Sequence, residues 1–166
     1  MHAARLILAV AVALFIGVAD ARADWQFTKW GMNPDQVAKA GGGKVSNLSA
    51  EELKEKNRFS GPSPYLMSMP YKAGAFDFTA YFRFTSGKLS RVTLELANPM
   101  QVPDLRTSLI GLYGQPYADE GGGFSRASWA DRKLNNNITL TVTTGAILGE
   151  AADLTYTLLD KSAGGL

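Results

Sequence analysis

The feature that most constrains the fold of this 166-residue chain is a strict alternation of side chains between residues 76 and 84. Every second residue there is apolar, and polar or amphipathic residues lie between them. A period of two is typical of a β-strand with one buried face. Residues 92–96 alternate in the same way, and Ser86-Gly87-Lys88 lies between the two stretches. The pattern predicts an antiparallel hairpin with one face in a core.

The pairing of the two strands is restricted, because directly opposed residues point to the same side of a sheet. Pairing Phe82 with Val92 places the apolar residues of both strands on one face. It leaves a three-residue loop at residues 86–88, with Thr85 opposite Leu89.

The same register predicts an aromatic and cationic cluster on the outer face of the hairpin. Tyr81 lies opposite Thr93, and Arg83 lies opposite Arg91. Guanidinium groups hold carboxylates and phosphates through paired hydrogen bonds, and a tyrosine ring can anchor a partner. The cluster therefore predicts a binding face for a small anionic ligand or for an acidic patch on another envelope protein. The alternative is a solvated face on which a neighbouring carboxylate neutralises the arginines.

Two short helices are predicted before the hairpin, and each begins with a capping box. Asn33 and Gln36 mark the start of the first, and Ser49 and Glu52 mark the start of the second.

The second half of the chain repeats this change from helical to strand periodicity. Pro103 begins a third predicted helix with a stripe of apolar residues, and Gly114 ends it. The inward residues of three further strands are Ala127 and Trp129, then Ile138, Leu140 and Val142, then Leu154, Tyr156 and Leu158. Residues 131–137 and 145–153 are the predicted connections.

These elements predict an α+β fold of order ααβββ-αβββ, with about six antiparallel strands and the helices packed on one face. Residues 24–166 are predicted to form a single domain, because no linker separates two independent cores. Residues 24–98 and 99–160 are two possible diverged halves of that domain.

Residues 1–23 are predicted to form a secretory signal peptide. Arg5 precedes an apolar run at residues 6–19, which is shorter than the about 20 residues that a membrane span needs. Small residues then favour cleavage after Ala23, so that the mature chain begins at Asp24. The chain also has no cysteine for a lipid anchor. We therefore expect a periplasmic or secreted protein without a stable membrane anchor, and an uncleaved anchor is the alternative.

Cleavage would also remove His2, the single histidine of the chain. Without histidine and cysteine, the mature chain cannot form a Ser-His-Asp site, a Cys-His site or a typical zinc site. Once Arg5, Arg22 and Asp20 are removed, 15 basic and 14 acidic side chains remain. This near-neutral balance does not favour nucleic acid as a partner. We expect a non-catalytic protein without a metal or cofactor.

Carboxylate chemistry is the main catalytic alternative. Glycoside hydrolases use two carboxyl groups about 5–10 Å apart. Asp77 and Glu95 are the best candidates, because both project from the outer face of the predicted hairpin. The other interpretation is that both are solvated surface carboxylates. A structural envelope component without a discrete ligand is a third interpretation of the whole chain.

Two short motifs resemble those of a known module. Gly31-Met32 is followed by Val37, and the third predicted helix ends in Tyr113-Gly114-Gln115-Pro116. In this respect the chain resembles β-lactamase-inhibitor-protein-like domains, in which a helix precedes an antiparallel meander. It departs from their pattern by ending the first helix in Gly41-Gly42-Gly43. The resemblance implies a binding or assembly role on a sheet face.

Overall fold

The computed structural model describes residues 25–145 and 149–159. The predicted signal peptide at residues 1–23, with its cleavage site at Ala23 and Asp24, lies outside the described residues. The elements are α1 (Pro34–Ala40), β1 (Ser46–Asn47), α2 (Ala50–Lys56), β2 (Tyr65–Ala73), β3 (Phe76–Thr85), β4 (Lys88–Leu96), the 3-10 helix η1 (Pro99–Gln101), α3 (Val102–Tyr113), β5 (Ala118–Glu120), β6 (Phe124–Asp131), β7 (Asn136–Gly145) and β8 (Gly149–Leu158).

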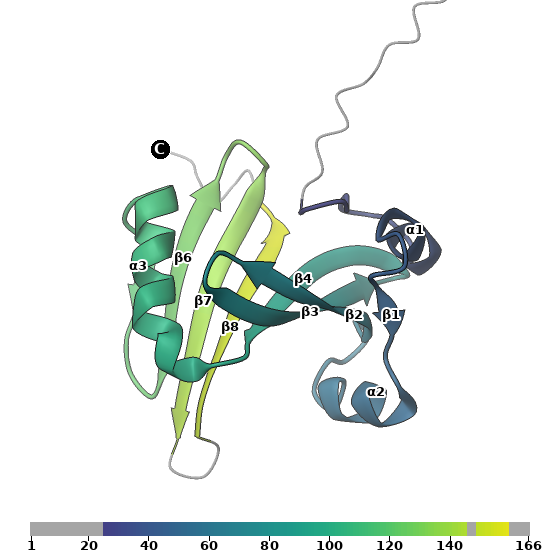
Figure 1. The fold of residues 1–166 in the computed structure, drawn as a ribbon, viewed down its shortest axis with the longest axis horizontal. Helices are drawn as coiled ribbons and strands as arrows, with labels where there is room; N and C mark the ends of the chain where they lie inside the picture. The colour runs from purple at the N-terminus through teal and green to yellow at the C-terminus, as the bar shows by residue number, and fades with distance from the viewer. Residues whose placement is uncertain (1–24, 146–148, 160–166) are drawn as a thin grey trace, which may run out of the picture.

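The strands form one antiparallel sheet in the order β1-β2-β3-β4-β8-β7-β6-β5. The predicted mixed fold, the three helices and the antiparallel pairing are confirmed. The described sheet has eight strands rather than six, because the two-residue β1 and the three-residue β5 add a short strand at each edge. β4 and β8, the last strands of the two halves of the chain, pair with each other in the middle of the sheet. Figure 1 shows that the sheet is strongly twisted. In this view β2–β4 run horizontally, whereas β6–β8 run vertically.

The register predicted for the β3–β4 hairpin is confirmed from Phe78 to Arg83. It is wrong at the turn, where a β-bulge shifts the pairing. Phe84 opposes Leu89, and Thr85 opposes Lys88, which leaves a two-residue loop. The bulge has a clear cause, because it turns Leu89 into the core, where the side chain is 2% exposed.

One face of the sheet, the core face, carries the buried side chains. Phe82 of β3 and Ile138 and Leu140 of β7 are at most 1% exposed. Leu105 and Leu109 of α3 pack into the same cluster, and α3 runs beside β6–β8 in Figure 1. The burial of these leucines confirms the first part of the predicted apolar stripe of the third helix, but Leu112, which was predicted to continue it, is 74% exposed.

The prediction that all helices pack on one face is wrong for α2. Val37 of α1 belongs to the core cluster with the leucines of α3. Lys56 at the end of α2, however, contacts Tyr81 and Glu95, which project from the opposite face, here called the outer face. The short α2 buries no residue fully. The apolar pattern of the sequence therefore did not place this helix.

Both predicted capping boxes are present, at Asn33 with Gln36 and at Ser49 with Glu52. Gly114 follows α3 with a φ of 80°, as expected for a helix-ending glycine. The predicted connection at residues 145–153 is too long, since β7 continues to Gly145 and β8 begins at Gly149. No helix in the part of the chain that the structure describes has the length and apolar character needed to cross a bilayer.

Candidate functional site

A row of hydroxyl groups crosses the outer face of the sheet. The strand pairings align one hydroxyl residue from each of six neighbouring strands, and we call this set the hydroxyl row: Ser68, Tyr81, Thr93, Thr155, Thr139 and Ser128. Such a row offers hydrogen-bond donors and acceptors across the whole sheet. It is a polar surface opposite the apolar core face.

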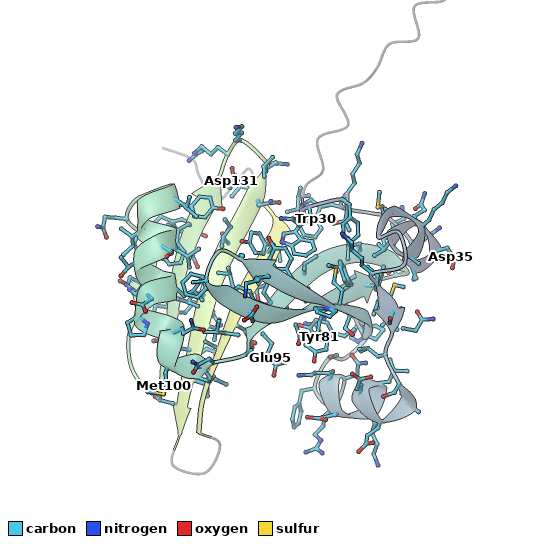
Figure 2. The ribbon with its side chains drawn as sticks, in the orientation of Figure 1. Trp30, Asp35, Tyr81, Glu95, Met100 and Asp131 are labelled. Carbon is cyan, nitrogen blue, oxygen red and sulfur yellow. The ribbon has the colours of Figure 1, made fainter. Side chains whose placement is uncertain are left out.

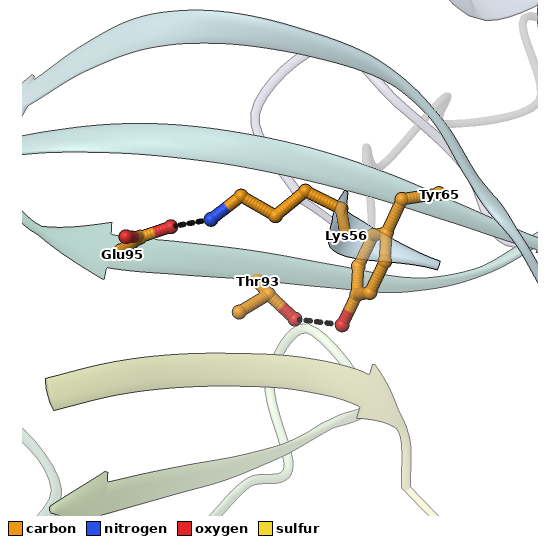
Figure 3. Close-up of polar contacts among 4 residues, drawn as sticks. All are labelled: Lys56, Tyr65, Thr93 and Glu95. Atoms are coloured by element: carbon orange, nitrogen blue, oxygen red, sulfur yellow. Dashed lines mark hydrogen bonds and ion pairs between the residues drawn. The ribbon is translucent and has the colours of Figure 1, made fainter. Parts of the chain in front are cut away.

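Hydrogen bonds within and beside the hydroxyl row fix several of its members. The Tyr65 hydroxyl lies 3.0 Å from Thr93 Oγ1, as Figure 3 shows, and Thr93 Oγ1 lies 3.5 Å from Thr155 Oγ1. Further along, Ser128 Oγ and Thr139 Oγ1 are 3.1 Å apart. Short side chains that bond one another hold a defined pattern of donors, which lowers the entropy lost when a ligand binds.

Two of the predicted site residues, Tyr81 and Thr93, lie side by side but are partly covered. Lys56 Nζ of α2 is 4.5 Å from the centre of the Tyr81 ring, and the Tyr65 ring contacts Tyr81 edge-on at 6.2 Å. Burial raises the pKa of Tyr81. Thr93 is only 8% exposed. Figure 2 shows Tyr81 and Glu95 on the same side of the β3–β4 ribbon. Helix α2 therefore occupies the space in which Tyr81 could anchor a partner.

The predicted Arg83 is half-buried and is held by hydrogen bonds to the main chain. Its Nε donates to the Ser63 carbonyl at 2.6 Å, and a terminal nitrogen donates to the Ser60 carbonyl at 2.7 Å. The guanidinium lies over the Tyr65 ring at 5.3 Å. These contacts tie the segment between α2 and β2 to the sheet. They also explain how Arg83 tolerates its opposed like charge, Arg91.

Arg91, the fourth predicted residue, borders a polar hollow in the outer face. The hollow has a volume of about 330 Å³. Its lining residues are all polar or cationic: Arg91, Arg126, Ser128, Asn137, Thr139, Thr141, Thr155 and Thr157. Short side chains of β7 and β8 form the floor, and the two arginines come from strands on either side. We call this site the arginine-flanked hollow.

The two guanidinium groups are available for binding. Neither Arg91 nor Arg126 forms a salt bridge with a side chain that the structure describes. Arg126 lies 5.4 Å from the ring centre of Phe124, and its cross-strand neighbour on β5 is the exposed Glu120. The alternation of Arg126 with Ala127 could have placed Arg126 on the outer face. Its proximity to Arg91 depends on the β4–β8 pairing, which no local pattern indicates.

A carboxylate pair lies beside the hydroxyl row. Glu95 opposes Asp153 directly across β4 and β8, and Lys56 forms an ion pair with Glu95. Burial, with a smaller effect of the Glu95 charge, raises the pKa of Asp153 from 3.8 to about 6. Burial opposes the charged form of Lys56, but the hydrogen bond and charge of Glu95 outweigh it and raise the pKa of that amine.

This pair differs from the predicted one. Asp77 forms an exposed ion pair with Lys72, at 2.9 Å, and Glu95 has Asp153 as its cross-strand carboxylate neighbour. Asp153 was missed because residues 145–153 read as a connection. Within the described residues, no group of three or more potential ligand side chains is arranged to hold a metal ion.

The arrangement can bind anions and hydroxyl-bearing groups. Two guanidinium groups face a floor of hydroxyls and one amide, which suits carboxylates, phosphates and polar main chain. A comparison with known proteins finds no family model, no curated protein and no solved structure that matches this chain.

Proposed function

We propose that this protein is an exported, non-catalytic binding module that holds an anionic partner in the arginine-flanked hollow. The observation that supports this proposal most directly is the position of Arg91 and Arg126 on the same hollow, without a described acidic residue among its lining. Two cationic groups that form no salt bridge with a described side chain favour an anion from outside. The hydroxyl floor supplies further hydrogen bonds to its uncharged parts.

The proposal shifts the centre of the predicted binding face. Of the predicted cluster, Tyr81, Thr93 and Arg83 have internal contacts, while Arg91 faces the hollow. Arg83 and Arg91 also line a smaller neighbouring hollow of about 290 Å³, so Arg91 separates two polar depressions. We infer that Arg91 is the residue through which the face acts.

Binding of a labelled hexaglutamate peptide at low ionic strength tests the proposal. Each charge-assisted hydrogen bond contributes about 1.5–3 kcal/mol, so we expect Arg91→Gln and Arg126→Gln each to weaken binding about tenfold or more. Affinity should also fall as salt is added, because exposed charges are screened. Fluorescence anisotropy measures both effects.

Arg132→Gln is the matched control, because Arg132 lies in the β6–β7 loop outside the hollow. Competition with citrate separates the two kinds of anion. Displacement of the peptide by citrate indicates a site for a small carboxylate, whereas an affinity for the peptide alone indicates an acidic protein segment. Equal binding by wild type, R91Q, R126Q and R132Q would exclude the hollow as the site.

The carboxylate pair supports a second candidate function, a carboxylate-dependent hydrolase. Asp153 has a pKa near 6, which suits a general acid, and the neighbouring Glu95 forms an ion pair with Lys56. Neither residue lines the arginine-flanked hollow. Release of nitrophenol from a panel of nitrophenyl glycosides by wild type, and its loss in Asp153→Asn and Glu95→Gln but not Asp77→Asn, would favour this function over simple binding.

A further inference from the structure

An apolar groove lies on the core face, on the opposite side of the sheet from the arginine-flanked hollow. Its volume is about 540 Å³. Tyr71, Phe76 and Phe78 line it from β2 and β3, and Leu109 and Leu112 line it from α3. Leu154 of the sheet also lines the groove and is 4% exposed, so the groove reaches the buried layer.

The edge of this groove is unusually apolar for a surface. Leu112 is 74% exposed, although its side chain belongs to the lining. An exposed large apolar side chain at the mouth of an apolar groove is typical of a binding site. Small-molecule sites occupy about 300–1,000 Å³ and are mostly apolar with a few polar groups, and this groove falls within that range.

The surroundings favour a small ligand over a broad protein interface. Along α3, Arg106 is paired with Asp119, and the neighbouring Thr107 and Ser108 are hydroxyl residues exposed to solvent. A stable protein interface buries about 800 Å² on each partner and has an apolar centre. The groove, with Leu112 at its edge, has a size that a single small molecule can fill.

The charge at the groove indicates the kind of ligand. Asp104, in the first turn of α3, is the single charged residue among its described lining. It forms no salt bridge with a side chain that the structure describes. Tyr71 and Phe76 add aromatic rings, whose faces attract cations. The groove therefore complements a positive charge attached to an apolar body.

We propose that the groove binds a small amphipathic cation, with its apolar body between α3 and the β2–β3 hairpin and its cationic group beside Asp104. This inference does not depend on the arginine-flanked hollow, which lies on the other face and attracts anions. The two sites can therefore be tested separately in the same protein.

Calorimetric titration with decyltrimethylammonium, kept below its micelle concentration, tests the proposal on the purified protein. We expect saturable binding to one site and weaker or absent binding of decyl sulfate, which has the same chain and the opposite charge. Asp104→Asn should weaken binding of the cation about tenfold and reduce the preference over decyl sulfate. It should leave hexaglutamate binding unchanged.

A matched pair of substitutions on α3 tests the location. Ser108 lines the groove and Thr107 does not, but each hydroxyl donates to the carbonyl four residues earlier at 2.9 Å. Ser108→Trp should therefore block the groove and abolish binding, while Thr107→Trp should bind like wild type.

Three results would overturn the proposal. These are the absence of saturable binding, equal binding of the cation and decyl sulfate, and equal binding by S108W and T107W. Self-association that S108W abolishes, without binding of the cation, would show that a second copy of the chain covers the groove instead. If S108W does not fold, the D104N titration alone still decides whether the site recognises positive charge.

Discussion

Glu95 and Asp153 face each other across β4 and β8, so two carboxylates share the outer face where the halves of the sheet meet. Like charges directly opposed in a sheet are unfavourable. The molecule reduces this repulsion through the ion pair of Lys56 with Glu95 and through the raised pKa of Asp153. Helix α2 therefore contributes a charge that the centre of the sheet requires, as well as a cover for Tyr81.

Stability should fall with rising pH around the titration of Asp153. The pKa is raised from 3.8 to about 6 in the folded protein, so the folded state binds this proton more tightly than the unfolded state. The proton's stabilising contribution is complete below about pH 4 and is lost as the pH rises through 6. Asp153→Asn should remove this dependence and raise the free energy of unfolding at pH 7 by about 1–2 kcal/mol.

Urea unfolding of wild type and D153N between pH 4 and pH 8 measures the difference. Asp77→Asn is the control, because Asp77 is an exposed partner of Lys72 and its loss should change stability by less than about 1 kcal/mol. Parallel pH profiles for wild type and D153N would contradict the assigned environment of Asp153.

Arg83 and Arg91 should respond differently to the same substitution, although they are directly opposed. Arg83→Gln removes charged hydrogen bonds to the Ser60 and Ser63 carbonyls and should lower the free energy of unfolding by about 1–3 kcal/mol. Arg91→Gln relieves a like-charge contact and should leave stability unchanged or raise it by less than about 1 kcal/mol. Denaturant titration distinguishes the two, and similar losses in both variants would count against a structural role confined to Arg83.

Deletion of Ser90 should be tolerated, because Ser90 is the extra residue of the bulge between Leu89 and Arg91. Removing it leaves Leu89 on the core face and Arg91 on the outer face, and it loses the hydrogen bonds of the Ser90 hydroxyl with Thr85 and with the Arg83 carbonyl. We expect a cost of about 1 kcal/mol. Thr93, in contrast, lies within regular pairing. Its deletion would move the side chains of β4 on one side of the deletion to the opposite face of the sheet, and it should prevent folding. Circular dichroism and thermal unfolding compare the two deletions, and equal damage would contradict the bulge assignment.

Local patterns predicted the hairpin, its central register and the helix starts because each depends on residues near in sequence. The predicted turn was wrong because the rule that opposed residues share a face does not take the burial of Leu89 into account. Leu89 can enter the core only if an extra residue interrupts the alternation. Asp153 was missed for a related reason, since a strand that begins with polar and small residues resembles a loop.

The candidate site was only partly predictable. Arg91 was found from the hairpin alone, while Arg126 joins it through strands that come from the other half of the chain. Arg83 is not free to bind a ligand because it donates to a carbonyl of the segment between α2 and β2. That segment has no periodic pattern from which the contact could be predicted. Side chains whose roles depend on distant segments are those that the sequence could not assign.

The central position of β4 and β8 has a consequence for how the protein is made. Strand β4 is complete in the first half of the chain, but its partner β8 ends at Leu158. Until synthesis reaches that point, one edge of β4 exposes unpaired main-chain groups that can pair with another chain. A nascent chain therefore carries an open strand edge while residues 97–158, more than a third of the chain, are still being made. Factors that keep such a chain unfolded until it is complete should improve the yield of native protein more than factors that act after release.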